Sequence, residues 1–86
     1  MEHSILVVED DEILADNIRT YLSLKGYEVI VGHRGELALE QIKRAQPDAV
    51  LTDTSLPGMS GHDLLRTLVA RAPDLKVIMM TGYGNV

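Results

Sequence analysis

Residues 49–61 read AVLTDTSLPGMSG, and this stretch decides the predicted fold because it joins a strand, an acid and a helix start. The apolar run at residues 49–51 is typical of a buried strand. Asp53 stands where that strand should end, and Ser60 has the position of a helix N-cap. Ligands of an open parallel sheet bind outside the carboxyl ends of its strands, which makes Asp53 a candidate for chemistry. Taken alone, Asp53 is better explained as an acid that ends a strand and stabilises a turn.

A second group of acids favours the functional explanation of Asp53 over the structural one. Four acids in succession, residues 9–12, directly follow the apolar run ILVV. Acids stabilise the positive end of a helix dipole, and a helix start accounts for Asp11 and Glu12. It accounts less well for Glu9 and Asp10, which come immediately after the strand. This pair is therefore a second candidate site.

The remaining pattern alternates strands and helices. Strands are predicted at residues 5–8, 27–31, 49–52 and 77–80, and helices from 13 to just before Gly26, from 36 to 45, and from Ser60 to just before Pro73. Ser60 and Asp63 have the spacing of a capping box. The inner faces of the three helices are predicted to comprise Leu14, Ile18, Tyr21 and Leu22; Ala38, Leu39 and Ile42; and Leu64, Leu65, Leu68 and Val69.

This order predicts the fold class. Helices between successive strands enforce a parallel sheet, and right-handed crossovers leave few arrangements. We predict an α/β, flavodoxin-like fold of three layers with strand order 2-1-3-4 and a switch point between the first and third strands. Glu9 and Asp10 end the first strand and Asp53 ends the third, so all three acids should meet in one crevice.

Three clustered carboxylates repel one another, and a hard divalent cation removes that cost. Oxygen ligands without His or Cys favour Mg²⁺, with Mn²⁺ or Ca²⁺ as alternatives. Such a cation could neutralise an incoming phosphoryl group, so Asp53 could act as a phosphoryl acceptor. Thr81 follows the fourth strand and could donate a hydrogen bond to a phosphate oxygen, although a β-branched residue is also simply common in strands. Gly82 would allow the backbone to approach an anion closely.

Composition excludes several classes of function. The 86 residues suffice for one domain, 1–86, and the net charge of −5 with only three aromatic residues argues against direct binding of nucleic acid. No apolar run approaches the about 18 residues of a membrane span, and no basic segment indicates a signal peptide. The absence of cysteine fits the cytoplasm. Solvated surface positions are predicted for His3, His33 and His62, which share no spacing.

Three motifs in order, VVEDD, DTSLPGMSG and MMTG, resemble the receiver domain of two-component response regulators from Ile5 to Gly84. The resemblance implies a domain, rather than an enzyme, that is phosphorylated on Asp53 by a sensor histidine kinase. The TGYGNV ending is similar to receivers that precede a transcriptional-activator ATPase module. The resemblance also implies a metal site, in which Glu9 and Asp10 are the acidic pair, Asp10 is the more direct ligand and Ser55 contributes its main-chain carbonyl. It places Thr54 and Gly82 beside the phosphate and makes Thr81 the switch hydroxyl. Pro57 and Gly61 match the loop that follows the phosphorylated residue.

One departure from the family pattern leads to an alternative hypothesis. Receiver domains continue with another helix, a fifth strand that carries a lysine, and a last helix, and none of Lys25, Lys43 and Lys76 matches that lysine. The chain is therefore expected to be incomplete at its C-terminus, with residues 77–80 as an exposed edge strand. A switch-deficient interaction fragment that forms homo-oligomers through exposed or swapped elements is the alternative. A phosphohydrolase would need an acid at Ser55 and is disfavoured.

Overall fold

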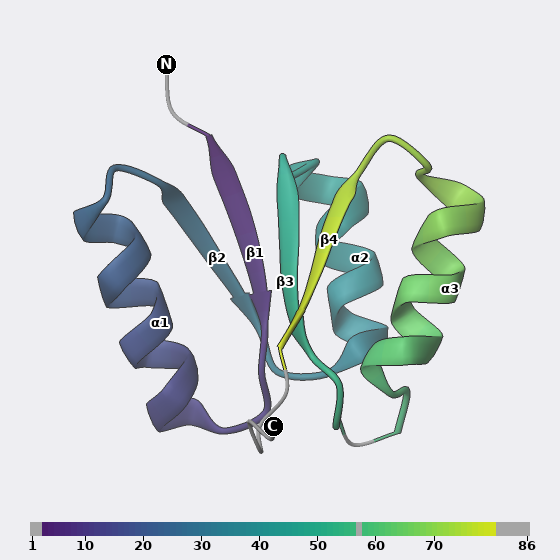
Figure 1. The fold of residues 1–86 in the computed structure, drawn as a ribbon, viewed down its shortest axis with the longest axis horizontal. Helices are drawn as coiled ribbons and strands as arrows, with labels where there is room; N and C mark the ends of the chain where they lie inside the picture. The colour runs from purple at the N-terminus through teal and green to yellow at the C-terminus, as the bar shows by residue number, and fades with distance from the viewer. Residues whose placement is uncertain (1–2, 57, 81–86) are drawn as a thin grey trace.

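The computed structural model describes residues 3–56 and 58–80. The strands are β1 (Ser4–Val8), β2 (Glu28–Gly32), β3 (Ala49–Asp53) and β4 (Lys76–Met80), and the helices are α1 (Glu12–Leu24), α2 (Gly35–Ala45) and α3 (Gly61–Arg71). The alternation predicted from the sequence is therefore confirmed, with strand and helix bounds close to those expected (Figure 1).

The four strands form one parallel sheet in the order β2-β1-β3-β4. Val8 of β1 pairs with Gly32 of β2 on one side and with Thr52 of β3 on the other. Asp53 pairs in turn with Met80 of β4. Figure 1 shows all four arrows pointing the same way, so the carboxyl ends of β1, β2 and β3 lie at one edge of the sheet. This arrangement confirms the predicted strand order and its switch point.

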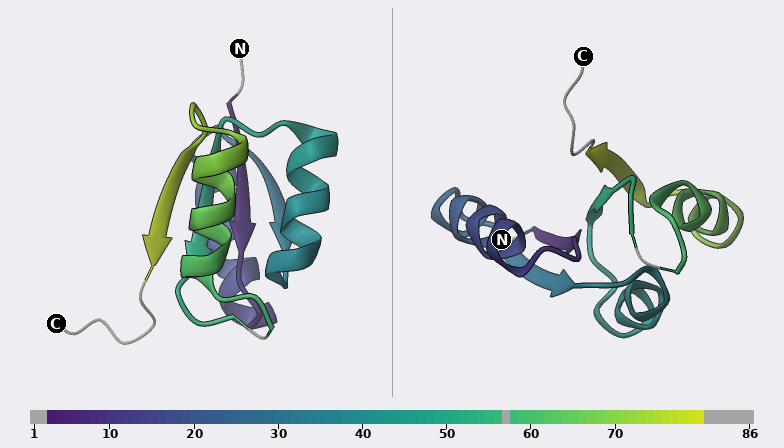
Figure 2. Two further views of the ribbon diagram at one scale, coloured as in Figure 1. Left: turned by 90° about the vertical axis from the view of Figure 1, so that its right-hand side faces the viewer. Right: turned by 90° about the horizontal axis from the view of Figure 1, so that it is seen from below.

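The helices cover the two faces of the sheet unequally. Helices α2 and α3 lie on one face and α1 lies on the other (Figure 2). The main core lies beneath α2 and α3, because apolar side chains from both helices interdigitate there with those of β1 and β3. Its buried members are Leu6, Val8, Ala38, Val50, Leu64 and Leu68.

The predicted inner faces of two helices were too wide. Ile18 and Leu22 of α1 are half-buried, but Leu14 is 41% exposed and Tyr21 is 61% exposed. Helix α1 packs on β1 and β2, so only the part of its apolar stripe that faces these two strands is covered. In α3, Val69 is 61% exposed because it lies one residue, and hence about 100° around the helix, beyond the buried Leu68.

Strand β4 pairs with β3 on one side and has no partner on its other side among residues 3–56 and 58–80. Ile78, in the middle of β4, is 56% exposed. This agrees with the expectation that the fourth strand forms an edge. None of the helices in these residues is long and apolar enough to cross a membrane.

Candidate metal centre at the carboxyl edge of the sheet

Three carboxylates converge where β1 and β3 end. Glu9, Asp10 and Asp53 each offer one oxygen, and these oxygens all lie within 4.8 Å of one another. Glu9 is 2% exposed and Asp53 is 8% exposed, whereas Asp10 lies at the surface. The predicted convergence of two acidic groups that are more than 40 residues apart in sequence is therefore observed, and its cause is the parallel register of β1 and β3.

The Glu9 carboxylate is only partly satisfied by hydrogen bonds. Its Oε2 accepts a hydrogen bond from the Asp11 main-chain N–H at 3.0 Å. Its Oε1 is buried and has no hydrogen-bond partner among the described residues. Burial raises the pKa of Glu9 to about 7, with Asp53 adding to the rise and the Asp11 N–H opposing it. A buried carboxylate that has one oxygen without a donor and lies beside two other acids fits a bound cation.

Asp53 is held by the loop that follows β3. Its Oδ1 accepts a hydrogen bond from the main-chain N–H of Ser55 at 3.1 Å. The Gly61 N–H at the start of α3 donates to the Thr54 carbonyl at 3.2 Å. A Cβ on Gly61 would lie only 2.1 Å from the Asp53 carbonyl oxygen, so glycine is required for this close approach. The N-terminus of α3 is thus packed directly against the backbone of Asp53.

The two neighbouring acids at helix starts have a different role. Asp11 caps α1, because its Oδ1 accepts hydrogen bonds from the N–H groups of Ile13 at 3.0 Å and Leu14 at 3.1 Å. This confirms the helix-start interpretation of Asp11. At α3, the Ser60 hydroxyl accepts from the Asp63 N–H at 3.1 Å. The side chains of Asp63 and Arg66 pair at 2.5 Å, and this contact, together with Ser60, lowers the pKa of Asp63.

The candidate metal centre opens to solvent through a depression of about 460 Å³. Thr54 and Ser55, predicted to contact the phosphate and the metal, both line it. The predicted roles of Pro57, Thr81 and Gly82 concern residues outside the described ones and stay predictions. The depression is lined by Glu9, Asp10, Asp11, Leu14, Asp53, Thr54 and Ser55.

His33 is exposed, as predicted, but it also makes a contact that the sequence did not reveal. Its Nδ1 lies 2.9 Å from the main-chain carbonyl oxygen of Glu9. His33 directly follows β2, so the same strand-end argument that selected Glu9 and Asp53 could have selected it. His3 and His62 are exposed, as predicted.

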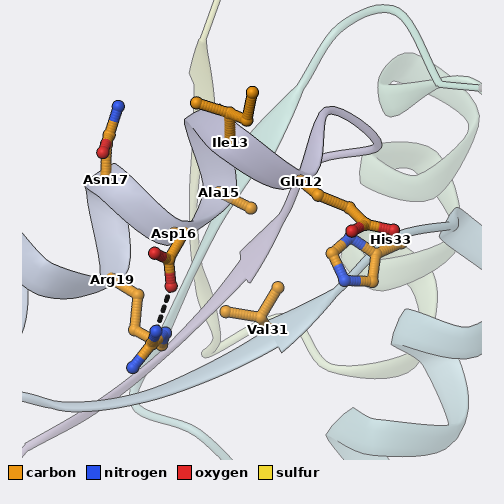
Figure 3. Close-up of a pocket in the computed structure, with 8 residues that line it drawn as sticks. All are labelled: Glu12, Ile13, Ala15, Asp16, Asn17, Arg19, Val31 and His33. Atoms are coloured by element: carbon orange, nitrogen blue, oxygen red, sulfur yellow. Dashed lines mark hydrogen bonds and ion pairs between the residues drawn. The ribbon is translucent and has the colours of Figure 1, made fainter.

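A second depression, of about 470 Å³, lies between α1 and the end of β2 (Figure 3). Asp16 and Arg19 pair with each other on its α1 side. His33 lines it at the end of β2, with Glu12 from the start of α1 (Figure 3). His33 therefore stands between this depression and the backbone of the metal centre.

Comparison with protein families agrees with this geometry. Residues 5–86 match the model of the response regulator receiver domain. The chain is 38% identical over 86 residues to the response regulator protein FleR of Pseudomonas aeruginosa, covering 100% of this chain and 18% of FleR. It is 46% identical over 82 residues to the sensory transduction protein RegX3 of Mycobacterium tuberculosis, covering 95% of this chain and 36% of RegX3. The chain thus spans well under half the length of these relatives.

The chain is also similar to solved structures of response regulators and receiver domains. A putative response regulator from Chloroflexus aurantiacus is similar with a TM-score of 0.93 and 34% identity, over 100% of this chain and 72% of that one. A CheY-like receiver domain protein from Methanospirillum hungatei has a TM-score of 0.92 and 32% identity, over 100% and 69% of the two chains.

Proposed function

This chain belongs to the response regulator receiver domain family, and we propose that Asp53 accepts a phosphoryl group in a reaction that depends on Mg²⁺. The observation that carries the proposal is the meeting of the Asp53 carboxylate with Glu9 and Asp10 within 4.8 Å. Receiver domains pair with sensor histidine kinases, so the proposed donor is a phosphohistidine. One oxygen of Asp53 forms the new P–O bond while the P–N bond breaks and its electron pair returns to the ring nitrogen. The phosphohistidine ring, protonated on its other nitrogen, then leaves as a neutral imidazole.

The acids around Asp53 explain the proposed need for a cation. A phosphoryl group that approaches Asp53 meets the negative charge of Asp10 and, when it is ionised, of Glu9. Oxygen-only ligands favour Mg²⁺, with Mn²⁺ as a substitute, and the bound ion would neutralise charge on the phosphoryl oxygens. Glu9 and Asp10 would hold the ion with Asp53 and the Ser55 carbonyl, Asp10 being the exposed and more direct ligand.

The remaining roles in the proposal follow from the family pattern. Thr54 lines the depression beside Asp53 and would contact the phosphoryl oxygens together with Gly82. The Thr81 hydroxyl would report phosphorylation to a binding surface. The domain would act as a switch for an output, here proposed to be transcriptional, rather than as an enzyme with a separate substrate. The net charge of −5 disfavours direct binding of nucleic acid or of an anionic membrane surface by this segment, and protein partners in the cytoplasm are part of the proposal.

Incubation with a small phosphodonor such as acetyl phosphate tests the acceptor. With Mg²⁺, intact-mass analysis should show one phosphoryl adduct, and chelation of the metal should prevent its formation. Asp53→Asn should abolish the adduct. Asp63→Asn is the matched control, because Asp63 is an exposed acid at a helix start, and this variant should be phosphorylated normally. An adduct that persists in Asp53→Asn would assign the acceptor elsewhere.

A second candidate function, a self-associating interaction fragment, is favoured by the exposed β4 edge. Ile78 is 56% exposed on a strand whose outer side has no partner among the described residues. Such an edge can pair with another strand. Light scattering should then give a mass above the 9.5 kDa of one chain, and Ile78→Lys should lower it toward that value. A wild-type chain that stays monomeric at high concentration would refute this candidate.

A further inference from the structure

We infer that His33 is a positioning residue for the metal centre: its Nδ1–H holds the Glu9 carbonyl and thereby orients the peptide that joins Glu9 to Asp10. This inference rests on the proposed binding of Mg²⁺ by these two acids. His33 would act on the proposed ligands through the backbone, because its ring contacts the main-chain carbonyl oxygen of Glu9 rather than a carboxylate.

Residues at the end of β2 contact both the main-chain N–H and the main-chain carbonyl of Glu9. The Glu9 N–H donates to the Gly32 carbonyl at 2.9 Å. The Glu9 carbonyl oxygen lies 2.9 Å from His33 Nδ1. Strand β1 ends at Val8, so Glu9 lies just beyond the last residue of the strand. The His33 side chain takes the place of the main-chain donor that a longer strand would have supplied.

The Glu9 carbonyl determines which nitrogen of the His33 ring carries a proton. A carbonyl oxygen can only accept a hydrogen bond, so Nδ1 must carry a proton. In the neutral ring this leaves Nε2 unprotonated. His33 therefore acts as a fixed donor, and its tautomer is determined by Glu9 rather than by solvent.

The orientation of one peptide plane affects two proposed ligands. The Glu9 carbonyl lies in the same rigid peptide unit as the Asp10 N–H. Rotation of this unit would move the Asp10 side chain directly and would change the direction in which the Glu9 side chain leaves the backbone. One oxygen of Glu9 is anchored only by the Asp11 N–H, and the other has no partner among the described residues. The His33 contact therefore supplies orientation that the carboxylates themselves lack.

Three variants and a control test this role through Mg²⁺ affinity, followed by NMR amide shifts. His33→Ala removes the donor and should weaken Mg²⁺ binding by about tenfold, the lower end of the effect of losing a supporting hydrogen bond at a metal site. His33→Asn keeps a donor close to the position of Nδ1 and should bind Mg²⁺ nearly as tightly as the wild-type chain. His33→Gln places its donor one bond further out and should resemble alanine. His62→Ala, at an exposed histidine of α3, should leave affinity unchanged.

Further measurements separate positioning from general damage. Excess Mg²⁺ should recover most of the phosphorylation rate in His33→Ala, because the loss is one of affinity. Long-range proton–nitrogen spectra of the metal-free chain should show His33 protonated on Nδ1. An unprotonated Nδ1, or equal Mg²⁺ affinity in wild type and His33→Ala, would overturn this inference and leave the proposed function standing. If His33→Ala does not fold, equal affinities in the asparagine and glutamine variants would overturn it instead. A wild-type chain that binds no Mg²⁺ would overturn both.

Discussion

The acids at the strand ends and the acids at the helix starts have the same chemistry but different surroundings. At the helix starts, Asp11 accepts two main-chain N–H groups and Asp63 pairs with Arg66. At the strand ends, Glu9 is buried beside other acids and one of its oxygens has no donor among the described residues. The pKa of Asp63 is accordingly lowered, while that of Glu9 is raised to about 7. The acids at the helix starts are stabilised by the donors beside them, whereas the clustered acids at the strand ends are the proposed cation site.

The largest difference between the two groups should appear in metal binding. Asp10→Asn should weaken Mg²⁺ binding by about 100-fold, because loss of a direct ligand should cost at least as much as loss of its support. Asp63→Asn removes the same charge from an exposed helix start and should change the affinity by less than about twofold, since surface charges are screened. Calorimetric titration of both variants measures the two constants. Equal losses would mean that net charge, rather than the cluster, attracts the ion.

Glu9→Gln should change the pH dependence of stability. The folded pKa of Glu9 is raised from 4.5 to about 7, so the folded state holds a proton that the unfolded state has already lost. Metal-free wild-type stability should therefore fall as pH rises from 5 to 8, with Glu9 contributing about 2 kcal/mol of that fall. The glutamine variant should lack this contribution.

Urea unfolding at pH 5 and pH 8 measures the effect, with the wild type and Glu9→Gln compared under the same conditions. Mg²⁺ should restore wild-type stability at pH 8, because a bound cation stabilises the ionised acid. Parallel pH profiles of the two metal-free proteins would show that the surroundings of Glu9 do not raise its pKa.

Asp11→Ala should lower the free energy of unfolding by about 1 kcal/mol, since α1 loses its N-cap. Asp11→Asn is the matched control because its side-chain oxygen can still accept the N–H groups of Ile13 and Leu14. Urea unfolding of the two variants at neutral pH is the measurement. If both lose the same stability, the charge of Asp11 matters more than its hydrogen bonds.

The smallest effect should come from Arg66→Ala. The pair with Asp63 is exposed, and such pairs contribute little to stability because solvent and salt screen them, so we expect the urea midpoint of Arg66→Ala to match that of the wild-type chain. The pKa of Asp63 should rise toward its ordinary value, which an NMR titration can follow. A clearly lower urea midpoint for Arg66→Ala would show that this exposed ion pair is also important for folding.

The sequence predicted the fold well because its signals are local. Apolar runs, helix caps and glycine stops lie within a few residues of the elements that they predict, and β-α alternation leaves few topologies. The sequence also located Glu9, Asp10 and Asp53, since each follows an apolar run that ends at the same edge of the sheet. The prediction that Leu14, Tyr21 and Val69 are buried was wrong. Helical periodicity marks an apolar stripe but does not specify how much of that stripe a neighbouring element covers.

By itself, the sequence determined the order of the elements, the strand ends that carry acids and the family. Only the tertiary structure decided which oxygen of Glu9 lacks a donor, and that His33, 24 residues away, contacts the Glu9 carbonyl. The physical reason is that a hydrogen bond depends on positions within a few tenths of an ångström. Those positions are determined by the register of β1 against β2 and β3, which no local pattern in the sequence encodes.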